Sequence, residues 1–352
     1  MASSQALVDL LLEMLAMPCT TGEEGPIADW LESRYARAGE RIRRAGNSIV
    51  AGGADDGRPV VLLVGHTDVV PPTDADRRPR VDGERVVGRG ASDMKAGLAV
   101  AMDCFEDSGL RAGPYDLVLV AYAAEEGLYS GNELGPVLAA MPDLTEAALA
   151  VVLEPTDLTV QLGCMGAVHA EVTFRGRAAH SARPWQGDNA LTKAGDFLTE
   201  LHERTPADVT VDGLTYREVM TATGGWTINA RNVVPDAFTV NLNYRYAPDK
   251  EPGQAEERIR DLVGDRAEVT MADHAGAGRP HRHAELLAAF LRAVDAPVEP
   301  KQAWTDVARL TAAGVPALNY GPGVTAQAHQ RGEWVPAANL AVARSAMATF
   351  LG

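Results

Sequence analysis

Several residues that could bind a metal follow directly after strongly apolar segments of this chain. They are His66, Asp68, Glu125, Glu126 and Glu154. An apolar run without alternation is typical of a strand that is buried on both faces. Open α/β sheets bind their ligands at the carboxyl ends of such strands. We therefore expect these side chains to meet at one edge of a sheet.

Two further candidates, Asp93 and His329, lie next to glycine-containing turns in "GRGASDMKAG" and "GPGVTAQAHQRGEW". Asp93 has two interpretations that the sequence leaves open. It could be the N-cap of a helix that begins at Met94, or its carboxylate could point into a cleft at the sheet edge. A phosphate-binding loop is not indicated, because neither the dinucleotide fingerprint nor a Walker motif is present.

These residue types indicate a metal site with oxygen and nitrogen ligands. Two histidines and several carboxylates without cysteine suit zinc, cobalt or manganese, and this number of ligands is compatible with two ions. Asp68 lies two positions after His66, so on a strand both face the same side. Asp68 could then bind one imidazole nitrogen and leave the other for a metal. For any single acid, a solvated loop carboxylate remains the alternative.

Composition excludes several classes of protein. The chain has 352 residues, with 32 basic and 48 acidic side chains and a net charge of −16, and it has no basic stripe. Binding to nucleic acid or to an anionic membrane is therefore not expected. The three cysteines are scattered, and the apolar N-terminal segment has no basic flank and contains Asp9 and Glu13. We expect a cytoplasmic protein without disulfides, signal peptide or transmembrane segment.

The length and the hydrophobic patterns predict two domains. Residues 1–166 and 277–352 alternate buried-type strands with helices, which predicts an α/β domain with a mainly parallel sheet. Residues 167–276 contain strands with alternating polarity and predict an inserted α+β domain with an antiparallel sheet. An amphipathic helix is expected at the N-terminus, and Thr21 with Glu24 resembles a capping box for the next helix.

Five ordered motifs resemble a known family: "GHTDVVPP", "GRGASDMKAG", "AAEEG", "LEPT" and "AHQRGEW". Together they are similar to the co-catalytic zinc deacylases and carboxypeptidases, and the resemblance covers essentially the whole chain. The segments "GRAAHSARPWQGDNA" and "WTDVARLTAAGVPALNYGPG" look most like actinobacterial succinyl-diaminopimelate desuccinylases.

The resemblance implies a role for each motif residue. His66 and Glu154 would bind one Zn²⁺, Glu126 and His329 would bind the other, and Asp93 would bridge them. Asp68 would orient His66, and Glu125 would be the general base for a metal-bridging water. In this family the inserted domain is a dimerisation lid, and His180 would reach the active site of the other subunit of a homodimer. Asn232, Arg245 and Gly323 would contact the substrate.

The function implied is hydrolysis of an N-acyl amino acid, with N-succinyl-LL-2,6-diaminopimelate as the first candidate. Another N-acyl amino acid, a carrier-protein-linked amino acid or a dipeptide remains open. A non-catalytic metal-binding scaffold is a different alternative. His180 and Arg245 also have ordinary interpretations, as an exposed or interface histidine and as a solvated charge on an alternating strand.

Overall fold

The computed structural model describes residues 4–54 and 56–352, and the chain forms two compact units. Unit 1 comprises Met1–Gly163, Pro280–Lys301 and Thr305–Gly352, whereas unit 2 comprises Cys164–Arg279 together with Gln302–Trp304. The three-residue segment Gln302–Trp304 is far in sequence from the rest of unit 2.

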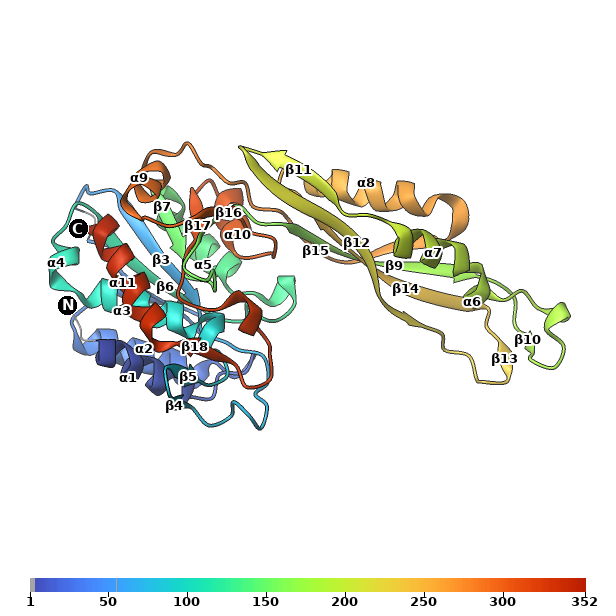
Figure 1. Ribbon diagram of the computed structural model, residues 1–352, viewed down its shortest axis with the longest axis horizontal. Helices are drawn as coiled ribbons and strands as arrows, with labels where there is room; N and C mark the ends of the chain where they lie inside the picture. The colour runs from blue at the N-terminus through green and yellow to red at the C-terminus, as the bar shows by residue number, and fades with distance from the viewer. Residues whose placement is uncertain (1–3, 55) are drawn as a thin grey trace. The chain divides into compact units, whose positions relative to one another are not determined.

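Unit 1 is built on a mixed sheet whose centre is parallel (Figure 1). In spatial order its strands are β1 (Ile42–Ala45), β2 (Ser48–Gly52), β6 (Asp116–Tyr122), β3 (Val60–His66), β7 (Leu149–Val152), β17 (Ala317–Asn319), β8 (Val160–Leu162) and β16 (Val298–Pro300). The four central strands β6, β3, β7 and β17 pair in parallel. They are buried almost throughout, because unbroken apolar runs can face packed layers on both sides. The predicted mainly parallel sheet is confirmed.

Helices and a small sheet complete unit 1. The helices are α1 (Ser4–Leu15), α2 (Gly25–Arg37), α3 (Ala96–Glu106), α4 (Ser108–Arg111), α5 (Leu134–Ala140), α9 (Glu285–Ala293), α10 (Val307–Ala312) and α11 (Ala337–Leu351). The small antiparallel sheet has the order β18 (Trp334–Pro336), β5 (Arg85–Val87) and β4 (Arg80–Asp82). Helices α1, α3 and α11 pack against one another, and α3 lies against β3 and β6 (Figure 1).

Close packing places α3 against the end of β7. A Cβ atom on Gly97 would lie 1.8 Å from the main-chain oxygen of Leu153, so only glycine fits there. Leu153 directly precedes Glu154. The first turn of α3 and the strand end that carries Glu154 are therefore held in a fixed register.

The predicted N-terminal amphipathic helix is confirmed, because α1 buries one apolar face, but the capping box is wrong. Helix α2 starts at Gly25, and Glu24 has no side-chain capping bond to it. The Glu24 carboxylate instead accepts from the Gly22 N–H, and the Thr21 hydroxyl donates to Asp68 at 2.9 Å. The Thr21 hydroxyl thus donates to a distant carboxylate, whereas in a capping box it would accept from a backbone N–H of the helix.

Unit 2 contains a five-stranded antiparallel sheet covered on one face by helices (Figure 1). The order is β11 (Ala207–Val211), β12 (Leu214–Trp226), β14 (Ala237–Tyr246), β9 (Gly166–Arg175) and β15 (Glu268–Ala275). The helices are α6 (Ala190–Lys193), α7 (Gly195–Glu203) and α8 (Pro252–Val263). Alternate residues of β9 and β14 are buried in the core under these helices. This alternation confirms the predicted antiparallel sheet.

The segment Gln302–Trp304 binds to unit 2 through specific hydrogen bonds. The Gln302 amide oxygen accepts from the Arg217 N–H at 3.1 Å, and the Trp304 indole donates to the Gly276 carbonyl at 3.0 Å. No local pattern in the sequence distinguishes these three residues, which is why the sequence could not assign them to unit 2.

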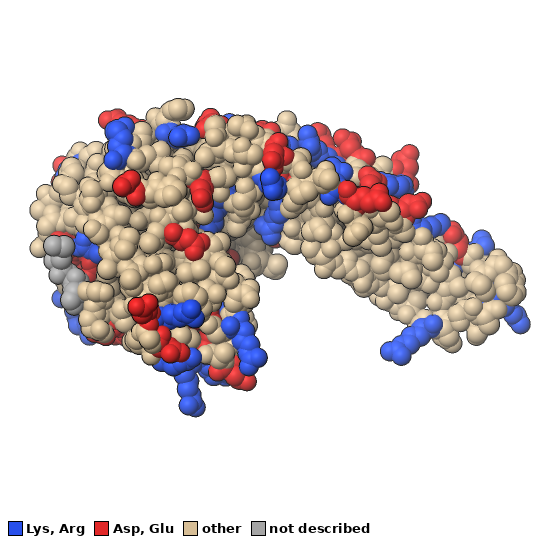
Figure 2. Space-filling view, viewed as in Figure 1, with Lys and Arg blue, Asp and Glu red and all other residues tan. Residues whose placement is uncertain are grey.

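Surface charges of both signs are interspersed on the face shown in Figure 2, with acidic and basic side chains mixed over α8. Within the residues that the structure describes, no helix combines the length and the apolar character needed to cross a membrane.

Candidate metal centre

His66 is the last residue of β3, and its side chain is fully buried. Its Nδ1 lies 3.0 Å from the main-chain oxygen of Asp68. In the neutral tautomer with a proton on Nδ1, this nitrogen donates to that oxygen and Nε2 keeps its lone pair. Nε2 faces Asp93 Oδ1 at 3.3 Å and Glu154 Oε1 at 3.9 Å. One histidine and two carboxylates therefore converge on one point.

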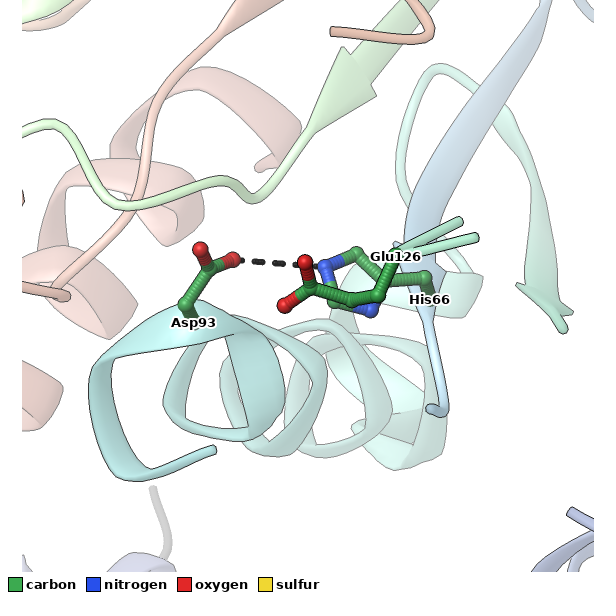
Figure 3. Close-up of side chains that lie close together, drawn as sticks. All are labelled: His66, Asp93 and Glu126. Carbon is green, nitrogen blue, oxygen red and sulfur yellow. Dashed lines mark hydrogen bonds and ion pairs between the residues drawn. The ribbon is translucent and has the colours of Figure 1, made fainter. Parts of the chain in front are cut away.

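A second convergence lies beside the first. His329 Nε2 is 2.7 Å from Glu126 Oε2 and 3.6 Å from Asp93 Oδ2. The two oxygens of Asp93 thus face two different histidines. One ligand atom from each of His66, Asp93 and Glu126 lies within 4.8 Å of the others (Figure 3). The placement of Asp93, with one carboxylate oxygen toward each histidine, is the geometry expected of a carboxylate that bridges two cations.

The donor set fits divalent metal ions. Glu154 Oε1 is buried and has no hydrogen-bond partner among the described residues, which is costly unless a cation binds there. Burial, followed by the charge of Asp93, raises the pKa of Glu154 to about 7. Nitrogen and carboxylate ligands without thiolate suit zinc, cobalt and manganese, so the chemistry does not by itself select the metal.

Electrostatic coupling in this cluster is strong. Burial opposes the charged imidazole of His66, but the carboxylates of Asp68 and Asp93 raise its pKa well above the ordinary value. Burial also raises the pKa of Glu125 well above its usual range, and nearby negative charges add to this effect. Such a concentration of carboxylates needs cationic partners.

Asp68 organises the turn that carries the two adjacent glutamates. Its Oδ1 accepts from the Glu125 N–H and its Oδ2 from the Glu126 N–H, both at 3.0 Å. Oδ2 also accepts from the Thr21 hydroxyl, and Oδ1 lies 3.5 Å from His66 Nδ1. Burial opposes ionisation, but His66 and the two N–H donors lower the pKa of Asp68 to about 2. Asp68 contacts His66 mainly through its main chain, whereas its carboxylate holds residues 125 and 126.

Asp93 does not cap a helix. The N-cap of α3 is Lys95, and Asp93 lies before it in an irregular turn, Ala91–Lys95, with φ −118° and ψ 94°. The Asp93–Met94 peptide bond is cis. Of the two interpretations left open by the sequence, the structure supports the carboxylate that points at the histidines. Asp93 Oδ1 faces His66 (Figure 3), and Oδ2 faces His329.

Glu333 and Thr21 are site residues that sequence reasoning missed. Glu333 accepts hydrogen bonds from the backbone of the turn that carries Asp93. It lies four residues after His329 within a quoted motif, and that position was the available signal. Thr21 gave no usable signal, because its partner Asp68 is 47 residues away.

Gly323 lies in a turn that packs tightly against the metal-binding elements. A Cβ atom on Gly323 would be 2.2 Å from the Ser92 carbonyl oxygen, and one on Gly321 would be 2.4 Å from the Glu154 carbonyl oxygen. Both glycines are needed for this close approach. The turn therefore lies directly against the segments that carry Asp93 and Glu154.

Three predicted site residues lie in unit 2. His180 ends the short strand β10 (Ala179–His180), which pairs with β13 (Val233–Val234), and the Ser181 N–H donates to the Asn232 carbonyl at 2.9 Å. The structure therefore brings His180 and Asn232 together, and both are exposed. Arg245 lies elsewhere, on β14.

Arg245 has the properties of an anion-binding residue. It is partly buried, and burial lowers its pKa. Its Nε donates to Asn243 at 3.0 Å, and among the described residues no carboxylate lies within ion-pair distance of it. It lines a pocket of unit 2 together with Asp208 and Arg217, which form an ion pair with each other. A guanidinium without a carboxylate partner is suited to bind the carboxylate of a ligand.

Comparison with known proteins decides the family. The family model described as peptidase family M20/M25/M40 matches residues 62–352. The chain belongs to this family. The family is one of metal-dependent hydrolases, so the protein is a hydrolase, and the metal cluster described above agrees with that chemistry.

Relatives within the M20/M25/M40 family match the chain over nearly its whole length. It is 35% identical over 343 residues to a succinyl-diaminopimelate desuccinylase of Corynebacterium glutamicum, covering 95% of this chain and 90% of the relative. It is 30% identical over 382 residues to an acetylornithine deacetylase of Myxococcus xanthus, covering 99% and 98%. The structure of a tripeptidase from Staphylococcus aureus shares the fold, with a TM-score of 0.80, 18% identity and coverage of 100% and 98%. The resemblance found in the motifs is confirmed.

Proposed function

We propose that this protein is a dinuclear metal-dependent amide hydrolase that removes an N-acyl group from an amino acid. The observation that carries the proposal is the placement of Asp93, whose two carboxylate oxygens face His66 and His329 separately. A carboxylate placed between two imidazoles is what a bridged pair of cations requires.

In this proposal His66 and Glu154 would hold one ion, Glu126 and His329 would hold the other, and Asp93 would be shared by both. Zn²⁺ is the first candidate, and Co²⁺ or Mn²⁺ would also suit these ligands. When bound, such ions polarise the scissile carbonyl and bring the pKa of water toward neutrality.

Glu125 is the proposed general base. Its carboxylate takes a proton from the attacking water and later donates a proton to the nitrogen of the leaving amine. Its backbone N–H is fixed by Asp68 at 3.0 Å, next to the corresponding bond of Glu126. Glu126 can therefore bind a metal while Glu125 stays available for proton transfer.

The proposed substrate is N-succinyl-LL-2,6-diaminopimelate, which water cleaves to succinate and LL-2,6-diaminopimelate. The desuccinylase relative, 35% identical over nearly the whole chain, supports this choice. The unpaired guanidinium of Arg245 is suited to a substrate that carries several carboxylates. An N-acetyl amino acid is the second candidate, because the acetylornithine deacetylase relative also covers nearly the whole chain.

Unit 2 is the proposed dimerisation and lid domain, with residues 167–276 as its inserted segment. Several large apolar side chains are exposed on it: Trp185, Leu191, Trp226 and Ile228. Such residues suit an interface with a second copy of the chain. His180 would then act in the active site of the second copy as a donor to the oxyanion, with Asn232 beside it and Gly323 near the substrate.

The absence of any disulfide among the three cysteines is compatible with a cytoplasmic protein.

The test is a turnover screen of the metal-loaded protein against N-succinyl-diaminopimelate, N-acetylornithine and dipeptides. We expect the succinylated substrate to have the highest kcat/KM. Glu125→Gln should keep the metals and lose nearly all turnover, whereas Glu126→Gln should lose metal. A protein that binds metal but hydrolyses none of these amides would contradict the proposal and favour a scaffold.

A further inference from the structure

Glu333 is a fully buried carboxylate that the proposed chemistry does not use, and all of its contacts lie around the turn that carries Asp93. Its Oε1 accepts from the Ser92 N–H at 2.7 Å and from the Asp93 N–H at 2.9 Å. Its Oε2 accepts from the Gly90 N–H at 2.9 Å and from Arg89 Nη1 at 3.0 Å. Both oxygens are thus occupied by donors from residues 89–93.

The turn has two backbone hydrogen bonds of its own, from the Ala91 N–H to the Gly88 carbonyl oxygen at 3.0 Å and from the Lys95 N–H to the Gly90 carbonyl oxygen at 2.9 Å. Gly90 has a φ of +87° and Asp93 departs from helical geometry, and the N–H groups of Ser92 and Asp93 donate to the Glu333 carboxylate. The Glu333 carboxylate supplies acceptors for the backbone N–H groups of Gly90, Ser92 and Asp93, which lie just before α3, where a helix offers no acceptors of its own. It adds three hydrogen bonds to the two backbone hydrogen bonds of the turn.

The same residue connects the two sides of the metal cluster. Glu333 lies four positions after His329, and its main-chain oxygen accepts from the Gly88 N–H at 3.0 Å. The following residue, Trp334, accepts from the Ser92 hydroxyl at 2.8 Å and pairs with Val87. The segment that carries His329 is therefore bonded repeatedly to the segment that carries Asp93.

A second buried acid, Asp76, is linked to Glu333 through Arg89. Arg89 lies between Glu333 and Asp76, with Nη2 3.2 Å from Asp76 Oδ2. Asp76 also accepts from Thr73 and from the Gly332 N–H. Within the described part of the chain the Asp76 carboxylate contacts Thr73, Arg89 and Gly332 but none of residues 90–93, so it stabilises the surroundings without touching the turn itself.

We propose that Glu333 is a positioning residue for metal binding, which sets the distance between the Asp93 carboxylate and the two histidines. The proposal rests on the role of Asp93 as a bridging ligand in the proposed function. Its direct consequence is that the affinity for metal depends on the acceptor capacity of residue 333 and not only on the ligands.

The decisive variant is Glu333→Gln, which keeps the shape of the side chain. An amide has only one acceptor oxygen, so in either orientation its NH₂ group faces two of the four donors. The turn must then move, and the ligand geometry moves with it. We expect affinity for Zn²⁺ to fall by about 10- to 100-fold, the range found when groups that support metal ligands are removed.

Metal affinity is measured by calorimetric titration of the metal-free full-length protein with Zn²⁺, and by the visible absorption spectrum of the Co²⁺ form. Asp76→Asn is the matched buried control, because it weakens the neighbourhood but leaves all four Glu333 bonds. Glu84→Gln is the exposed control, because the Glu84 side chain is exposed in the turn between β4 and β5. Both controls should keep wild-type affinity and spectrum, whereas Glu333→Gln should lose affinity and shift the Co²⁺ bands.

Wild-type affinity and spectrum in Glu333→Gln overturn the proposal, as does an equal loss of affinity in Asp76→Asn. Asp93→Asn separates this failure from failure of the proposed function. If Asp93→Asn retains both metals, the bridging role itself is wrong; if it loses metal while Glu333→Gln does not, only the role of Glu333 is wrong. Should Glu333→Gln not fold, Glu333→Asp is compared with Asp76→Asn, and equal affinities count against the proposal.

Discussion

Replacement of Asp68 by asparagine should destabilise unit 1 and misplace the turn of Glu125 and Glu126. The Asp68 carboxylate accepts one backbone N–H on each oxygen, and the Thr21 hydroxyl donates to Oδ2. Asparagine offers one oxygen, so its NH₂ group faces at least one of these backbone donors in either orientation. A buried donor left without its acceptor costs about 1–3 kcal/mol, which is the expected loss of unfolding free energy.

The matched comparison is Thr21→Val, which is nearly isosteric and leaves both acceptors of Asp68 for the backbone. It removes one hydrogen bond, so its cost should be about 0.5–1.5 kcal/mol. The assay is urea unfolding of the metal-free protein, with circular dichroism used to follow the transition of unit 1. In the metal-loaded protein, kcat should fall much more in Asp68→Asn than in Thr21→Val. Equal unfolding free energies and equal kcat in the two variants would refute the inferred role of the carboxylate.

Three further outcomes are expected. Gly97→Ala should lower the unfolding free energy by about 3 kcal/mol or more, because its Cβ would overlap the Leu153 oxygen; thermal unfolding checks this. The pKa of Glu154 is raised to about 7, so Glu154 binds a proton below that pH and must release it to bind metal. Calorimetric metal affinity should thus rise as the pH increases through about 7, and a flat profile counts against this. Arg245→Met should raise KM for a succinylated substrate by about 10-fold or more with little change in zinc affinity, as steady-state kinetics and titration would show.

The sign of the pH effect on stability follows from the same carboxyl group. The folded metal-free protein holds the Glu154 proton more tightly than the unfolded chain, whose carboxyl pKa is near 4.5. This group therefore favours the folded state most at low pH, and its contribution is lost as the pH rises through about 7. Bound metal should remove this dependence, because the cation replaces the proton.

Several of the proposed metal ligands could be placed from the sequence, because they follow strands that have strong local signatures. The apolar run ending at His66 identifies a buried strand, and the edge of a parallel sheet brings such ends together. Residues without a strand in front of them were harder to place. For Asp93 the sequence left a helix cap and a ligand equally open, because the irregular turn before α3 has no local pattern.

Contacts between distant segments could not be predicted. Thr21 has the correct spacing for a local cap, but its hydroxyl binds Asp68 instead. The buried bonds of Glu333 depend on a turn that lies 240 residues or more earlier in the sequence, and no periodicity in the sequence indicates them. Sequence patterns thus indicate which groups do the chemistry, whereas the groups that hold them emerge only after the chain has folded.

The adjacent acids Glu125 and Glu126 show how the two kinds of information combine. Their like charges would repel in an unsupported turn, but Asp68 accepts both of their backbone N–H groups and so fixes the direction of each side chain. Glu126 points at His329, 2.7 Å away, which leaves Glu125 as the carboxylate that is not part of the ligand group. The Glu333 carboxylate likewise accepts backbone N–H groups of the turn that carries Asp93. In each turn, a buried acid outside the proposed ligand set accepts hydrogen bonds from the backbone of an acid that is suited to bind metal. Asp68 does this for Glu126, and Glu333 does it for Asp93. Irregular turns of this kind can present carboxylates that a regular helix or strand would direct elsewhere.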